Sequence, residues 1–199
     1  MLPFAFCWRI CIHSSVSEQG STRSYLGALI LIVSQTMSKD SVIRPASPAD
    51  YEATCALFDQ LDVLHREELP WLFRTPASRP RSQAWFDELL SSERSTVLLA
   101  AAPAVVGLAT VRMQSAPDFA VFIPQQWGVI DDIVVLPSWR RRGIGARLAR
   151  AAENWASERG AAWLELGVYD FNADARAFYE ALGYLPVSTK LRKPLTGAG

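Results

Sequence analysis

The sequence is poor in cysteine, and this scarcity narrows the chemistry open to the protein. Three cysteines occur among 199 residues, and only Cys55 follows Met37. The chain after Met37 therefore cannot form a disulfide framework or a zinc site with paired cysteines, and we expect no metal and a reducing, cytoplasmic setting. Because Cys55 lies close to Leu57, Phe58 and Leu61 in a helix-like segment, we predict a thiol in the core and not a reactive nucleophile.

The sequence also lacks an excess of positive or negative charge. Twenty Lys and Arg side chains balance twenty Asp and Glu, and half of the residues are hydrophobic. This composition is typical of one globular domain and argues against a dedicated nucleic-acid binder. The apolar run at residues 26–33 is shorter than the roughly 20 residues that cross a membrane, so no membrane partner is expected.

Residues 1–36 differ in composition from the rest, since they mix Cys7, Trp8 and Cys11 with a serine-rich stretch. We predict that Met37 is the true start, that residues 1–36 are a gene-model extension or a disordered N-terminal segment, and that residues 37–199 form one domain. A targeting peptide is the alternative, although the apolar run lies further from the start than a signal peptide usually places it.

The most informative stretch joins an apolar run to a turn that contains glycine. Residues 133–136 predict a buried strand that Pro137 ends, and an amphipathic helix follows from Ile144 to near Arg159. Between them lies Arg-Arg-Arg-Gly-Ile-Gly-Ala, residues 140–146. Such a turn directs several backbone N–H groups at one point, with the positive end of the helix dipole behind them. It therefore predicts a site for phosphate or pyrophosphate.

Two common phosphate loops do not fit this turn. A P-loop needs Lys-Ser or Lys-Thr after the second glycine, and neither follows Gly145. The dinucleotide fingerprint needs a small residue where this chain has Leu148, and an acid after the next strand. Arg140, Gly143 and Gly145 instead match Arg-x-x-Gly-x-Gly/Ala, which resembles the acetyl-coenzyme A loop of the GNAT superfamily of N-acetyltransferases.

A second motif near the C-terminus resembles the same superfamily over a region of roughly residues 41–195. It reads Asn172-x-x-Ala175-x-x-Phe178-Tyr179-Glu180-x-x-Gly183-Tyr184. The resemblance implies a mixed α/β, α+β-like GNAT fold. In that fold a central, twisted, mostly antiparallel sheet is flanked by helices and splayed at the acetyl-coenzyme A site.

Periodicity and the positions of proline and glycine predict the order of the elements. Helices are expected at residues 48–64, 67–74, 82–90, 144–159 and 173–182. Strands are expected at residues 42–44, 96–101, 105–113, 127–136, 163–168 and 187–191.

The resemblance implies acetyl-coenzyme A as cosubstrate and a primary amine as acceptor, with direct attack of the amine on the acetyl thioester in a ternary complex. By resemblance, the backbone of Ile133, Val134 and Val135 holds the pantetheine arm, Asn172 contacts the cofactor, and the turn holds the pyrophosphate through Arg140, Arg141, Arg142, Gly143, Ile144, Gly145 and Ala146. The basic cluster of Arg140, Arg141, Arg142, Arg147 and Arg150 is expected to neutralise phosphates.

Two adjacent acids, Asp131 and Asp132, are candidates for the base that relays the proton of the amine, because such a pair is unexpected inside a buried strand. Strand alternation predicts opposite faces for them. Asp131 shares parity with Ile133 and Val135, so we favour Asp131, and a β-bulge would reverse that choice. The alternative is that either acid binds backbone donors where the strands splay.

The helix tyrosine Tyr179 matches the tyrosine that the family places near the cofactor sulfur, so it is the candidate donor of a proton to the leaving thiolate and also a cofactor contact. Its neighbour Phe178 is expected in the core. The region of His65, Trp71 and Phe73 corresponds to the acceptor-side wall of GNAT proteins, so these residues are candidates for substrate binding. A solvent-exposed His65 is the alternative.

The identity of the amine stays open at this point, since a small molecule and a peptide or protein are both compatible with the residues. A non-catalytic acyl-coenzyme A sensor or interaction module of the same fold is the alternative function, and a homodimer is possible. An RNA-associated basic patch would require salt-sensitive binding.

Overall fold

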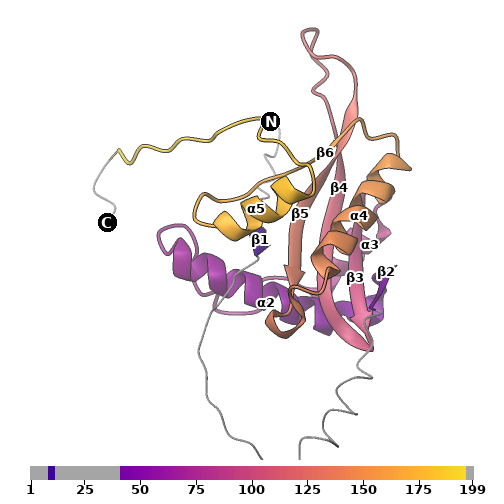
Figure 1. Ribbon diagram of the computed structural model, residues 1–199, viewed down its shortest axis with the longest axis vertical. Helices are drawn as coiled ribbons and strands as arrows, with labels where there is room; N and C mark the ends of the chain where they lie inside the picture. The colour runs from indigo at the N-terminus through magenta and orange to yellow at the C-terminus, as the bar shows by residue number, and fades with distance from the viewer. Residues whose placement is uncertain (1–8, 12–40, 196–199) are drawn as a thin grey trace, which may run out of the picture.

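The computed structural model describes residues 9–11 and 41–195. Its strands are β1 (Arg9–Cys11), β2 (Val42–Pro45), β3 (Ser95–Ala102), β4 (Ala104–Ser115), β5 (Gln126–Val135) and β6 (Leu164–Leu166). They form one sheet in the order β1-β5-β4-β3-β2, and β6 also pairs with β5 (Figure 1). Every pair from β2 to β5 is antiparallel, whereas β1 and β6 run parallel to β5. The predicted mostly antiparallel sheet is confirmed.

Helices cover both faces of this sheet. They are the 3₁₀ turns η1 (Pro48–Asp50) and η2 (Pro137–Trp139) and the helices α2 (Tyr51–Glu68), α3 (Gln83–Ser91), α4 (Ile144–Ser157) and α5 (Ala173–Ala181). On one face, Leu57, Phe58 and Leu61 of α2 are buried at helical spacing against the sheet. On the other face, Ile144 and Leu148 of α4 are buried together with residues of α5. The site described below lies where β5 meets these layers.

Two predicted elements are wrong. The helix expected at residues 67–74 is absent, because α2 continues unbroken to Glu68 and the chain then turns at Pro70, which lacks an N–H for a further helical bond. The strand expected at residues 187–191 is absent as well. Its pattern is strand-like, but no described strand lies beside it, and a strand needs a neighbour to complete its hydrogen bonds. Val187 and Leu191 are exposed there.

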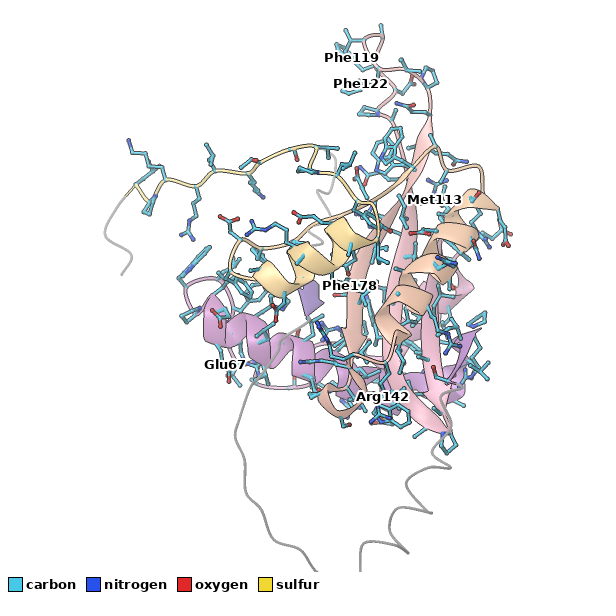
Figure 2. The ribbon with its side chains drawn as sticks, in the orientation of Figure 1. Glu67, Met113, Phe119, Phe122, Arg142 and Phe178 are labelled. Atoms are coloured by element: carbon cyan, nitrogen blue, oxygen red, sulfur yellow. The ribbon has the colours of Figure 1, made fainter. Side chains whose placement is uncertain are left out.

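The hairpin that joins β4 to β5 projects beyond the sheet (Figure 2). Phe119 and Phe122 lie in the connecting loop, and both are exposed. At its base, Trp127 stacks on Trp163 with ring centroids 5.1 Å apart.

Most of residues 1–36 lie outside the described part of the chain, so the boundary at Met37 stays a prediction. No helix in the described part is long and apolar enough to cross a membrane.

Candidate functional site

A β-bulge interrupts β5 where the two acids lie. Thr110 of β4 pairs with Asp132, and Val111, the next residue of β4, pairs with Ile130. One residue of β5, Asp131, is therefore extra to the ladder. A bulge of this kind bends the strand and redirects side chains, and bulges are frequent beside active sites.

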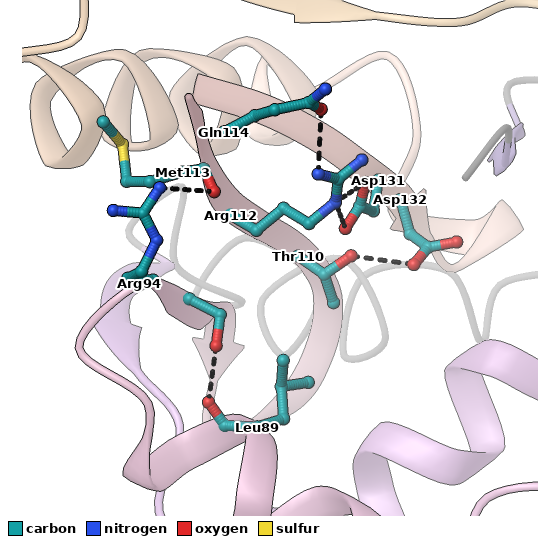
Figure 3. A network of polar contacts seen from close by, with 9 residues as sticks. Leu89, Arg94, Thr110, Arg112, Met113, Gln114, Asp131 and Asp132 are labelled. Carbon is teal, nitrogen blue, oxygen red and sulfur yellow. Dashed lines mark hydrogen bonds and ion pairs between the residues drawn. The ribbon is translucent and has the colours of Figure 1, made fainter. Parts of the chain in front are cut away.

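The bulge brings both acids to the same face of the sheet (Figure 3). The Thr110 hydroxyl donates a hydrogen bond of 2.7 Å to Asp132, and Arg112 Nε donates to the two oxygens of Asp131 at 3.1 and 3.0 Å. Thr110 and Arg112 are two residues apart on β4 and so share a face. The prediction that alternation separates the acids is wrong, and the parity argument for Asp131 fails with it.

The two carboxylates differ in their surroundings. Asp131 forms an ion pair with Arg112, whose other nitrogen Nη1 donates to the side-chain oxygen of Gln114 at 3.0 Å. Asp132 is buried, and it accepts a hydrogen bond from the hydroxyl of Thr110. A nearby guanidinium favours the charged form of a carboxylate, so the ion pair weakens Asp131 as a base. Which of the two acids accepts the proton stays a prediction.

Tyr179 is buried on α5, near the acids. Its hydroxyl is buried away from solvent, and within the described residues it has no hydrogen-bond partner. Burial is the main cause that raises the pKa of Tyr179 well above its usual value, and electrostatic interactions with Tyr184 and Asp132 add to it. The phenol is therefore neutral over the ordinary pH range, and it can donate a hydrogen bond to a group that acquires negative charge.

Asn172 positions the helix that carries Tyr179. Its side-chain oxygen accepts a hydrogen bond of 3.0 Å from the backbone N–H of Ala175, so it is the N-cap of α5. Asn172 is itself buried. Its capping role is thus established by the geometry, and its contact with a cofactor stays a prediction.

The turn after β5 has the backbone of an anion-binding nest. Arg141 and Gly143 have positive φ values of 61° and 76°, on either side of Arg142. In the described chain, no backbone N–H from Arg141 to Ala146 donates to a main-chain carbonyl. Successive amides that alternate with left-handed residues converge on one point at the start of a helix, which suits a phosphate.

The side chains of the predicted basic cluster serve partly to build the turn. Arg140 Nε donates to the carbonyl of Val135 at 3.0 Å, and Arg142 donates to the carbonyl of Ser138 at 3.0 Å. Arg147 donates to the hydroxyl of Ser41 at 2.9 Å and also to its carbonyl. Three of the five arginines therefore hold protein oxygens, a role that charge counting does not reveal. Arg141 and Arg150 are exposed.

Gly145 allows the two helices of the site to approach closely. Phe178 projects from α5 (Figure 2), and a Cβ on Gly145 would lie 3.2 Å from its ring. That distance is tight, so a side chain here would require the ring of Phe178 to shift. The second glycine of the motif is thus explained by packing.

On the side of α2, His65 lies in an aromatic cluster and is fully buried, so its predicted alternative as an exposed residue is wrong. Its Nδ1 donates to the Leu61 carbonyl at 2.9 Å. The rings of Phe73, Tyr169 and Phe171 lie 5.2, 5.7 and 6.3 Å from its ring. The structure thus brings two of the predicted wall residues, His65 and Phe73, together.

Trp71, the third predicted wall residue, is half exposed, and the guanidinium of Arg192 lies 3.5 Å from the centre of its ring. A contact of this kind between a cation and an aromatic face is attractive. Trp71 therefore contacts the C-terminal segment through Arg192 and stays half exposed.

Sequence reasoning missed four residues of the site: Thr110, Arg112, Tyr169 and Phe171. A signal existed for the first two, because they are polar residues two positions apart that interrupt an apolar strand, just as the adjacent acids interrupt β5. Tyr169 and Phe171 lie in a loop, where periodicity carries no information.

The residues whose side chains are described contain neither a cluster of metal ligands nor an accessible thiol. No group of three His, Cys, Asp or Glu in the described part could hold a metal ion. Cys55 is buried, as predicted, and burial raises the pKa of its thiol. A protonated, inaccessible thiol is a poor nucleophile.

Comparison with known proteins agrees with the geometry. The model of the acetyltransferase (GNAT) family matches residues 58–184. The chain belongs to this family. It is therefore an N-acetyltransferase of the GNAT superfamily, and the resemblance drawn from the two motifs is confirmed.

Relatives of this GNAT protein cover most of its length. An uncharacterized N-acetyltransferase of Bacillus subtilis, YhfO, is 29% identical over 143 residues, which are 71% of this chain and 88% of the relative. The crystal structure of a mutant of the BH1408 protein from Bacillus halodurans has a TM-score of 0.73 at 27% identity, covering 78% of this chain and 99% of that one.

An aminoglycoside N-acetyltransferase solved in complex with coenzyme A has a TM-score of 0.60 at 18% identity, covering 78% of this chain and 99% of that one. At this identity the likeness concerns the fold.

The splay expected of a GNAT sheet is present, because β6 pairs with β5 only from Gly128 to Ile130 while β5 continues to Val135.

Proposed function

We propose that the protein transfers the acetyl group of acetyl-coenzyme A to a primary amine by direct attack of the amine on the thioester. The continuity of β5 carries this proposal. One strand holds the bulged acidic pair, and five residues after its end the amide-rich turn begins. A single rigid element thus sets the distance between a proton acceptor and a phosphate site.

The chain offers a distinct group for each part of the cosubstrate. The amides from Arg141 to Ala146 suit the pyrophosphate, and the edge of β5 at Ile133 to Val135, which β6 has left, suits the amides of the pantetheine arm. Asn172, at the start of α5, is the further predicted contact. Acetyl-coenzyme A supplies the activated acyl group.

Two protons have to move in this reaction. The amine nitrogen bonds to the acetyl carbon, the carbon–sulfur bond breaks, and the leaving sulfur needs a proton that Tyr179 can donate. The amine proton passes through water to Asp132, which we assign because the ion pair with Arg112 weakens Asp131 as a base. β5 carries Asp132 and α5 carries Tyr179, so the arrangement of these two elements sets how the acid and the phenol are oriented relative to each other.

The proposal is tested by titrating acetyl-coenzyme A into the full chain in a calorimeter, followed by an assay of thiol release with a panel of small amines and peptides. Binding with release supports the proposal, and the amine that works identifies the acceptor class. Binding without release by any amine or peptide favours the sensor alternative. No binding by folded protein would overturn the assignment of the turn.

Replacing Gly143 with alanine tests the turn by itself. A Cβ at this position meets nothing within 4 Å, so only its φ of +76° is strained. We expect the free energy of unfolding to fall by about 1 kcal/mol and acetyl-coenzyme A to bind less tightly, as measured by denaturation and calorimetry. Gly160→Ala is the matched control, since φ is +75° there and the residue follows the far end of α4. It should lose similar stability and keep its affinity. Equal affinity in both variants would remove the turn from the binding site.

A further inference from the structure

The outer edge of β5 has two neighbours in succession. β6 pairs with it at Gly128, Val129 and Ile130, before the bulge. Past the bulge, β1 pairs with it in parallel at Asp132, Ile133 and Val134. β1 also contacts α2, and in Figure 1 it lies between α2 and α5. A segment from the N-terminal region thus occupies the splay between β5 and β6.

The same backbone groups cannot serve two partners. The edge of a strand has room for one extended neighbour at a time, because each neighbour lies about 4.8 Å away and uses the same outward N–H and C=O groups. The pantetheine arm is proposed to use the edge at Ile133 to Val135, and β1 pairs with Ile133 and Val134. We propose that β1 is an autoinhibitory strand that has to leave this edge before acetyl-coenzyme A binds. The inference rests on the proposed function, and it requires that the protein begins before Arg9, in place of the start predicted at Met37.

The length of β1 suits a reversible contact. A strand of three residues forms only a few ladder hydrogen bonds, each of modest net strength in water. Its attachment to the domain keeps its effective concentration high. Acetyl-coenzyme A can displace it because the cosubstrate is held at the turn as well as at the edge.

Competition of this kind raises the apparent Kd, which equals the intrinsic Kd divided by the fraction of molecules with a free edge. Removing β1 from the edge should tighten binding about tenfold if about nine molecules in ten hold the strand in place.

A pair of double variants of the full chain tests this. Adjacent amides of a strand point to opposite sides, so Ile10→Pro with Cys11→Pro removes at least one amide donor that faces β5, whichever of the two it is. Ile10→Val with Cys11→Val changes the same positions and keeps both amides. The readouts are the Kd of acetyl-coenzyme A and the hydrogen exchange of the β5 amides at residues 132–134 without ligand.

The proline variant should bind about tenfold more tightly than the natural chain, and its β5 amides should exchange faster, while the valine variant matches the natural chain in both. Equal affinity in all three proteins overturns the autoinhibitory strand and leaves the proposed function standing. No binding by any of them overturns the proposed function and this inference together. An intact mass of the native protein that begins at Met37 also overturns it, because β1 would be missing.

Discussion

Replacing Tyr179 with phenylalanine should lower kcat by about a hundredfold or more, because general acid catalysis by a positioned group is worth roughly that factor. The affinity for acetyl-coenzyme A should change little, since the ring is retained. The measurements are steady-state rates of thiol release and calorimetric titration.

The free energy of unfolding of Tyr179→Phe provides a second, independent test. The Tyr179 hydroxyl is buried, and within the described residues it has no partner, so removing it should leave the free energy of unfolding unchanged or raise it. Tyr184→Phe is the matched control. That hydroxyl donates to Glu153 at 3.3 Å on the side of α4, and its loss should spare kcat. Unchanged turnover in Tyr179→Phe would remove the phenol from the mechanism.

Replacing Asp132 with asparagine should lower kcat/KM about a hundredfold at neutral pH, again the usual scale of acid–base catalysis. The loss should shrink as the pH rises toward the pKa of the acceptor amine. A lysine-like amine has a pKa of about 10.4 and costs roughly 4 to 5 kcal/mol to deprotonate at pH 7, whereas an N-terminal amine with a pKa near 8 costs only about 1 kcal/mol. A pH–rate profile therefore reports on the base and on the class of amine.

Asp131→Asn is the control for this experiment. It leaves Arg112 without its ion-pair partner, so it should lower the melting temperature and affect kcat less than Asp132→Asn does. If Asp131→Asn instead abolishes turnover at neutral pH and Asp132→Asn does not, the assignment of Asp132 is wrong.

The elements of this protein were largely predictable because their signals are local. The stripe of Ile144 and Leu148 predicts α4, Pro137 and the glycines predict the turn, and Asn172 predicts the start of α5. These features depend on residues within one or two turns of each other. The two motifs also predicted the family correctly.

The parts that sequence reasoning missed depend on contacts between distant segments. The bulge at Asp131 is defined by its register with β4, and the burial of His65 depends on Tyr169 and Phe171, about a hundred residues away. The strand expected at residues 187–191 failed for the same reason, because a strand pattern does not supply a neighbour. Periodicity predicts which face of an element is apolar, and it leaves the identity of its partner open.

The bulge also changes how the length of this chain should be compared with that of its relatives. The pairing of β5 with β4 is in register on both sides of Asp131, so a relative without this residue would form an uninterrupted ladder and keep every other side chain on its present face. An alignment gap at this point would mark the loss of one acid and not a displaced strand. Inserting or deleting a single codon can therefore add or remove the Arg112 ion pair while the other residues of β5 keep their partners on β4.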